Sequence, residues 1–442
     1  MKNMKRALTV LLTLALALPL CLSGCGEKAA VPLRICVDVG GPNTSANFDN
    51  LLKTIADYGG PKDVEVEYVP QEGGDRESAI KHLKTELMSG AGPDLFIVET
   101  YGGGRTMYNK PMFPIPEQML ERRVFLPLDE YIEKAQFAKW DRLTPKVMEA
   151  GKGSEGQILV PLAYTLPLSC YRTEDYQHDI SPEHTWQEML DDDSGMLRQA
   201  GCFYRMGAGL IDSGVSGIFT GLADYKEEEL LFTQEELLEA VEQKLDLTEE
   251  DAGELPPCCQ CQLSLNLTPT CYSGANAGEV LYPKDPMTMV PQYNREGGVT
   301  AKVSAFAAIN RNSKRPEDAF FVLDYLLGRE AMGHSAFYLS LTGESGAMVM
   351  DLDMGRGELS FQQYPNMAEE NMAQIDKIRE AVTSVGFANA LDEQIRVAYI
   401  DAQNVLFLEG SGLSTCSPGA REEIEDIVRE AYRVMDMELK ES

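Results

Sequence analysis

Hydrophobic and polar positions follow a regular order over the first hundred residues. Residues 33–39 and 95–98 are apolar runs, and residues 64–68 alternate apolar with polar side chains, so each of these segments predicts a β-strand. Between them, residues 48–55 and 79–87 repeat apolar side chains at the spacing of an amphipathic helix. This β-α-β-α-β order predicts a parallel sheet that is covered by helices on both faces.

Polar and small residues mark the ends of these elements. Asp75 is placed to cap the second helix, Gly90 to end it, and residues 92–94 (Gly-Pro-Asp) to form the turn before the next strand. In a doubly wound sheet the ligand crevice lies beyond the carboxyl ends of the strands. The loops that open at Gly40 and Glu99 are therefore the candidate site loops.

The later part of the chain contains fewer clear elements. Trp186 begins a helix, and residues 233–236 (Thr-Gln-Glu-Glu) form a capping-box pattern that opens an acidic helix. Residues 305–309 predict a buried strand, and residues 316–327 predict a helix that starts at its proline. The apolar stripe in residues 424–439 predicts a last helix.

Residues 1–25 have the layout of an export signal. A basic start precedes the apolar stretch from Ala7 to Leu22, which is short for a membrane span, and the pattern ends in Leu22-Ser23-Gly24-Cys25. Because a cysteine ends it, the segment resembles the bacterial lipobox. That resemblance implies acylation of Cys25 and an extracytoplasmic, membrane-anchored protein.

The charge balance restricts the partners. The formal net charge is −31, which argues strongly against binding to nucleic acid. It also disfavours a peripheral hold on anionic lipid, which uses basic clusters, so attachment would depend on the acyl chains. The 418 residues from Cys25 to Ser442 suffice for two domains with substantial cores.

We expect no metal centre and no cofactor, although the cysteine pattern leaves one alternative open. Cys36 lies in an apolar run and is interpreted as a small buried hydrophobe. Residues 258–261 (Cys-Cys-Gln-Cys) with Cys271 match no zinc-knuckle spacing, which leaves a soft-metal site, a disulfide or unpaired thiols open. The four histidines have no metal-ligand spacing, and the acidic clusters lack the calcium-loop pattern and suit solvated faces.

Three segments, taken in order, resemble one protein family. They are residues 86–96 (Glu-Leu-Met-Ser-Gly-Ala-Gly-Pro-Asp-Leu-Phe), residues 156–188, and residues 307–327, which begin Ala-Ala-Ile-Asn-Arg-Asn-Ser. Together they resemble the extracellular solute-binding proteins of ABC importers, in particular the sugar-binding branch, family 1. Gln157 stands where that family usually has lysine, and Arg172-Thr173 where it has Asn-Lys.

The resemblance implies a two-lobed, type II periplasmic-binding-protein-like α/β fold, each lobe a sheet flanked by helices. Hinge crossovers are expected near 161–167, 298–304 and 338–346. The expected organisation is a signal peptide (1–24), a lipidated tether (25–32), lobe 1 (33–163), lobe 2 (164–300), a return segment of lobe 1 (301–338) and a helical part of lobe 2 (339–442). The protein is expected to act as a monomer.

Candidate ligand contacts follow from the crevice rule and from the expected crossovers. The crevice rule selects Asn43, Thr44, Glu99 and Tyr101. The crossovers and the second lobe add Tyr164, Thr165, Tyr272, Thr300 and Tyr338. Each residue also suits a plain structural role in a turn, a helix cap or hinge packing.

The resemblance implies a receptor that captures a small-molecule solute, a sugar or oligosaccharide, and delivers it to ABC permease subunits without catalysis. Within that fold, the acidic composition would also suit a cationic solute such as a polyamine. A different class stays open as well, a surface glycan hydrolase that uses an Asp/Glu pair.

Overall fold

The computed structural model describes most of the chain after residue 30. The described ranges are 31–41, 43–101, 110–173, 177–191, 214–247, 271–276, 287–342, 348–352 and 369–441. Cys25, Cys202, residues 258–261 and the export signal lie outside the described residues.

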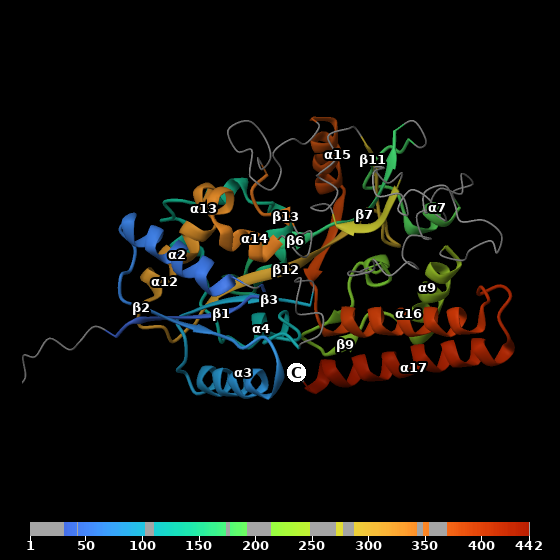
Figure 1. Cartoon of the computed structure of the whole chain (residues 1–442), viewed down its shortest axis with the longest axis horizontal. Coiled ribbons are helices and arrows are strands. Elements are labelled where there is room, and N and C mark those ends of the chain that lie inside the picture. The colour runs from blue at the N-terminus through green and yellow to red at the C-terminus, as the bar shows by residue number, and fades with distance from the viewer. Residues whose placement is uncertain are drawn as a thin grey trace, which may run out of the picture.

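The predicted β-α-β-α-β order is present. It consists of β1 (Leu33–Asp38), α2 (Thr44–Asp57), β2 (Val64–Tyr68), α3 (Gly73–Met88) and β3 (Leu95–Glu99). β1 pairs in parallel with both β2 and β3, as predicted. Figure 1 shows α3 on one face of these strands and α2 on the other.

The start of α3 differs from the prediction. The helix begins at Gly73, its N-cap is Glu72, and Asp75 lies in the first turn without capping it. Gly73 has φ +75°, a left-handed conformation that favours glycine and lets the chain turn into the helix three residues earlier. Asp75 is still favourable there, because a carboxylate in the first turn complements the helix dipole.

Seven of the described strands form one sheet. Its order is β13 (Met348–Val349), β6 (Val160–Thr165), β12 (Val299–Ile309), β3, β1 and β2, with β14 (Val382–Phe387) also pairing with β12. The second half of β12 lies antiparallel between β3 and β6, whereas its first half pairs in parallel with β14. One strand therefore links two parts of the molecule.

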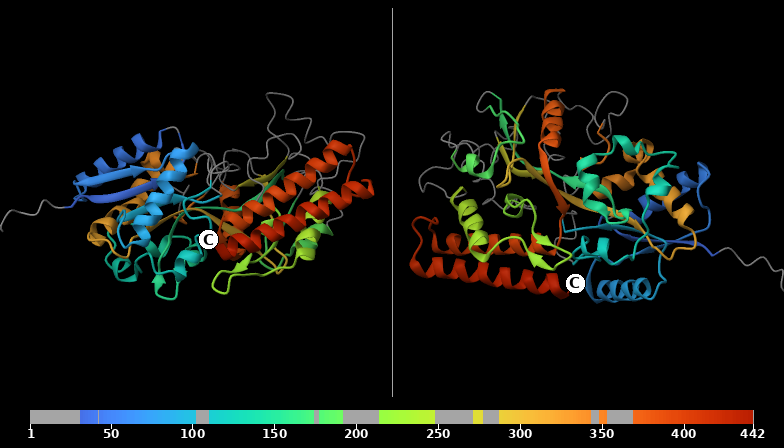
Figure 2. Two further views of the ribbon diagram at one scale, coloured as in Figure 1. Left: turned by 90° about the horizontal axis from the view of Figure 1, so that it is seen from below. Right: turned by 180° about the vertical axis from the view of Figure 1, so that it is seen from behind.

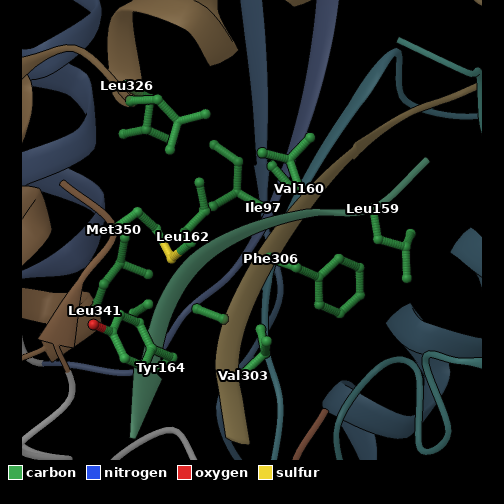
Figure 3. Close-up of a cluster of buried hydrophobic side chains, with 14 of the residues drawn as sticks. Ile97, Leu159, Val160, Leu162, Tyr164, Val303, Phe306, Leu326, Leu341 and Met350 are labelled. Atoms are coloured by element: carbon green, nitrogen blue, oxygen red, sulfur yellow. The ribbon is translucent and has the colours of Figure 1, made fainter. Parts of the chain in front are cut away.

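Helices cover this sheet and fill a large hydrophobic core, here called cluster 1. They are α12 (Pro316–Leu326), α13 (Arg329–His334) and α14 (Ala336–Thr342), together with the short helices α4 (Gln118–Glu121), α5 (Asp129–Ile132) and α6 (Pro145–Met148). Figure 3 shows Ile97, Leu326 and Leu341 together on one side of the strands, from β3, α12 and α14, while Phe306 of β12 points to the other side. Cys36 is a buried free thiol in this core, as predicted, and burial raises its pKa well above the ordinary value.

A second hydrophobic core, here called cluster 2, lies in the other half of the molecule. It is formed mainly by α7 (Trp186–Leu190), α9 (Gln234–Leu247), α16 (Ala390–Glu409) and α17 (Pro418–Glu441). The predicted stripe on the last helix is buried at Ile424, Val428 and Met435. Figure 2 shows α16 and α17 side by side along their length.

Smaller elements complete the fold. A second sheet has the order β10 (Cys271–Asn276), β7 (Pro167–Arg172), β11 (Met287–Pro291), and α15 (Glu369–Glu380) packs on β11. Two short ribbons are β4 (Lys152–Gly153) with β5 (Gly156–Gln157), and β8 (Ala223–Asp224) with β9 (Glu229–Leu230). Three 3₁₀ turns are Trp140–Arg142, Glu149–Gly151 and Ser216–Ile218.

The segment from β6 to β7 and the long strand β12 coincide with the first two expected crossovers. β6 lies in the large sheet and β7 in the second sheet, with only Leu166 between them. Past the expected end of the return segment at residue 338, Leu341 and Met348 still pack in cluster 1. The exact lobe boundaries stay a prediction.

Candidate functional site

The two candidate loops lie together at the carboxyl ends of β1 and β3. The backbone N–H of Gly40 donates to Oε2 of Glu99 at 2.8 Å, and Thr44 Oγ1 donates to the carbonyl of Gly40 at 2.6 Å. Glu99 and Thr44 are buried, whereas Asn43 is exposed. The crevice rule thus identified loops that are neighbours in space.

The 99–101 loop continues toward the other half of the molecule. Thr100 donates its backbone N–H to the carbonyl of Ser304 on β12 at 2.9 Å, and Tyr101 donates its own to the carbonyl of Ala388 at 3.2 Å. The Tyr101 ring is half-buried against cluster 2, and this burial raises the pKa of its phenol. Tyr101 therefore joins the end of β3 to the start of α16.

The crossover residues hydrogen-bond to the protein itself in this conformation. Tyr164 OH accepts from Nε of Arg379 at 2.9 Å. The Thr165 hydroxyl donates to the Lys302 carbonyl at 3.4 Å, and the Thr300 hydroxyl donates to the Phe219 carbonyl at 3.1 Å. Thr165 ends β6 and Thr300 lies near the start of β12, both with buried side chains, while Tyr164 packs in cluster 1.

Two further candidates lie elsewhere. Tyr338 is buried in cluster 1 on α14, and burial raises its pKa. Tyr272 is on β10, opposite Cys170 of β7. The ligand-binding role of all nine candidates stays a prediction.

Where clusters 1 and 2 meet, five polar side chains form a group that the sequence reasoning missed, here called the polar junction. Its members are Glu117, Tyr225, Lys302, Asn389 and Asp392. Phe387 belongs to cluster 1 and Leu391 to cluster 2, so Asn389 lies between the two cores. The 99–101 loop reaches this junction through the contact between Tyr101 and Ala388.

Glu117 is the central buried carboxyl of the polar junction. Oε1 accepts from the backbone N–H of Phe387 at 3.0 Å, and Asn389 Nδ2 donates to both carboxyl oxygens at 3.2 Å. Burial raises the pKa of Glu117 to about 7, although these hydrogen bonds and the charge of Lys302 act in the opposite direction. Glu117 therefore exchanges a proton near neutral pH.

The remaining members surround this carboxyl. Lys302 Nζ lies 2.9 Å from Oδ1 of Asp392, and both side chains are largely buried. Asn389 Nδ2 donates to Tyr225 OH at 2.8 Å, and burial, together with the charges of Glu117 and Asp392, raises the pKa of Tyr225. The junction thus combines hydroxyl, amide, carboxyl and ammonium groups in one protected place.

One signal in the sequence pointed to part of this group. Asn389 caps α16, and the Asp392 carboxylate accepts a hydrogen bond from the Asn389 N–H, a capping box that the Asn-x-x-Asp spacing encodes. Nothing local marks Glu117, because its partner Asn389 is 272 residues away. Contacts between residues so far apart in the sequence form only when the chain folds.

Within the described ranges, no group of three or more His, Cys, Asp and Glu residues is arranged to hold a metal ion. None of the helices in those ranges is long and apolar enough to cross a membrane.

No protein-family model matches the sequence, and no curated protein matches it either. Many solved structures are similar in fold, including these three. One is an extracellular solute-binding protein, family 1, from Alicyclobacillus acidocaldarius, with 13% identity, a TM-score of 0.55, and coverage of 93% of this chain and 100% of that chain. Another is the cyclic alpha-maltosyl-1,6-maltose binding protein of Arthrobacter globiformis, with 14% identity, a TM-score of 0.50, and the same coverage of 93% and 100%.

The third is a de novo designed cysteine esterase, with 14% identity, a TM-score of 0.53, and coverage of 93% and 98%. At such identities the likeness shows the fold alone. The chain has the two-lobed α/β fold of the extracellular solute-binding proteins, as the sequence predicted. A designed esterase shares this fold, so the fold by itself does not separate binding from catalysis.

Proposed function

We propose that this protein is the substrate-binding component of an ABC importer and captures a sugar or oligosaccharide between its two lobes. The observation that carries the proposal is the polar junction, which lies between two hydrophobic cores and receives the 99–101 loop. Sugar sites combine an aromatic surface with a few directed polar groups. Tyr101, Asn43 and the polar junction supply both kinds of group.

The fold supports a hinge mechanism. β12 and the β6–β7 segment run between the two parts, so a ligand that contacts both favours the closed arrangement over the open one. The solute-binding proteins with this fold support a binding role, and the A. globiformis protein is named for a maltose-type sugar. No bond has to be broken for this task.

The export signal supports the cellular context. A lipid on Cys25 would keep the receptor at the outer side of the cell membrane, close to its permease. Residues 26–32 make a short tether ahead of β1 at Leu33.

Thermal unfolding with a ligand panel tests this function. We expect neutral oligosaccharides to raise the melting temperature of the protein, because a ligand at a hundred times its Kd adds about 2.7 kcal/mol to the stability. Tyr101→Ala should abolish the shift, whereas Tyr58→Ala, at an exposed tyrosine of α2's C-cap, should retain it. A shift with spermidine instead would favour the cationic-solute alternative.

The same samples test the hydrolase alternative, for which the raised pKa of Glu117 is the specific observation. A glycosidase would need Glu117 as the acid and a second carboxylate such as Asp392. We expect no release of reducing ends from any glycan. Release that disappears in Glu117→Gln would overturn the binding proposal.

A further inference from the structure

A groove runs along α3, and none of the five polar-junction residues lines it. It encloses about 790 Å³ and is lined by one face of the helix together with the segment 110–114. Figures 1 and 2 show α3 beside the carboxyl end of α17, and Lys110 lies 3.9 Å from Glu438 of that helix. This volume is in the range of small-molecule sites.

The groove is cationic in a strongly acidic protein. Lys81, Lys84 and Lys110 line it against a single carboxylate, Glu77, which leaves an excess of two positive charges. Arg76 also lines it, but its guanidinium is paired with the buried Asp38 at 2.7 and 3.0 Å. The pair of Lys110 with Glu438 adds little compensation, because Lys110 is exposed.

Lys84 is the most informative of these residues. It is half-buried, and burial lowers the pKa of its ammonium, as do the charges of Arg122 and Lys110. Lys84 makes no hydrogen bond or ion pair with any residue that the structure describes. A half-buried cation beside two other cations is unfavourable unless an anion compensates it.

The rest of the lining is apolar. Ile80 lies one turn before Lys84 and Met88 one turn after it on the same face of α3, and Pro111 and Pro114 line the groove from the neighbouring segment. Met88 is 70% exposed, so its side chain is accessible to a ligand from solvent. The groove therefore offers an apolar surface next to a concentrated positive charge.

We propose that the α3 groove binds a phosphate monoester whose organic part lies on Ile80, Met88 and the two prolines. A monoester carries close to two negative charges at neutral pH and three acceptor oxygens, which match the excess charge of the three lysines. The organic part accounts for the apolar half of the groove. This site is separate from the proposed solute site between the lobes.

Titration calorimetry with phenyl phosphate, inorganic phosphate and phenol tests the site. We expect phenyl phosphate to bind more tightly than inorganic phosphate, and phenol not to bind. Lys84→Gln should raise the Kd of phenyl phosphate roughly tenfold or more, since a hydrogen bond to a charged group is lost. Lys84→Arg should retain binding, and Lys314→Gln, at an exposed lysine outside the groove, should have no effect.

Two further measurements keep the test decisive. Met88→Asp places a carboxylate at an exposed position of the groove and should also weaken phenyl phosphate. Lys84→Gln and Met88→Asp should both keep the wild-type unfolding midpoint. They should also keep the wild-type response to the oligosaccharide panel, which separates this site from the one between the lobes. Absence of phenyl phosphate binding, or an unchanged Kd in Lys84→Gln, would overturn the proposal.

Discussion

Two buried carboxyl groups in this protein have opposite surroundings. Asp38, at the end of β1, faces the guanidinium of Arg76 in a two-pronged ion pair at 2.7 and 3.0 Å. Glu117, in the polar junction, faces the neutral amide of Asn389 and a backbone N–H, while the nearby Lys302 is engaged by Asp392. The first carboxyl is held by a charge, and the second is held by neutral donors.

These surroundings distinguish two kinds of buried carboxyl group. Asp38 belongs to a structural ion pair, whereas Glu117 can change its charge. A buried charge with a dedicated partner is stable as a unit, and its two halves depend on each other. A buried carboxyl without one becomes neutral at a higher pH, as the raised pKa of Glu117 records. We expect the polar junction to respond to pH through Glu117.

The largest effect is expected from Arg76→Met. Removing the guanidinium leaves the Asp38 carboxylate buried and uncompensated, which typically costs about 3–5 kcal/mol. Urea unfolding at pH 7, with the midpoint and slope fitted together, measures this loss.

Two variants frame this result. The double variant Asp38→Asn with Arg76→Met should recover part of the loss, because no buried charge remains. Arg433→Met, at an exposed ion pair on α17, should leave the unfolding midpoint nearly unchanged. A loss below about 1 kcal/mol for Arg76→Met would show that the two carboxyl environments are not so different.

The second largest effect is expected on the pH dependence of the free energy of unfolding, which Glu117→Gln should change. Because the pKa of Glu117 is raised from 4.5 to about 7, the folded state binds more protons than the unfolded state between these values. The stability that this group contributes is therefore full below pH 4.5 and is lost as the pH rises to about 7, by up to about 3 kcal/mol. Glu117→Gln should remove this part of the slope in urea unfolding measured from pH 4.5 to 8.

A second variant tests the cause of the slope. The charge of Lys302 lowers the pKa of Glu117, so Lys302→Met should extend the declining region of the stability curve to higher pH. Identical slopes in wild type and Glu117→Gln would mean that Glu117 keeps the same charge in both states.

The smallest effect is expected from Tyr225→Phe. This change removes the hydroxyl that accepts from Asn389 Nδ2 at 2.8 Å and costs about 1 kcal/mol, since Asn389 keeps its contacts with Glu117. Thermal unfolding measures it. A loss as large as that of Arg76→Met would place Tyr225 at the centre of the polar junction.

Local patterns in the sequence were sufficient to predict the elements from β1 to β3. The strand patterns of β1, β2 and β3 alternate with the amphipathic patterns of α2 and α3, and this order predicted the parallel pairing of the strands. The capping box at Thr233 and Glu236 is present as predicted, and so is the buried stripe on α17. The crevice rule brought the loops at Gly40 and Glu99 together because the carboxyl ends of parallel strands share one edge.

Tertiary structure alone decided which polar groups are buried together. Glu117 meets Asn389 across 272 residues, and Tyr164 meets Arg379 across 215, so no short pattern records either contact. Thr165 and Thr300 were predicted as ligand contacts from their position in the chain, and only the fold shows that their hydroxyls donate to backbone carbonyls. The sequence by itself determined the elements and their order, since these depend on neighbours a few residues apart. The charge state of the polar junction depends on burial and on distant partners, which exist only once the two halves of the chain have packed against each other.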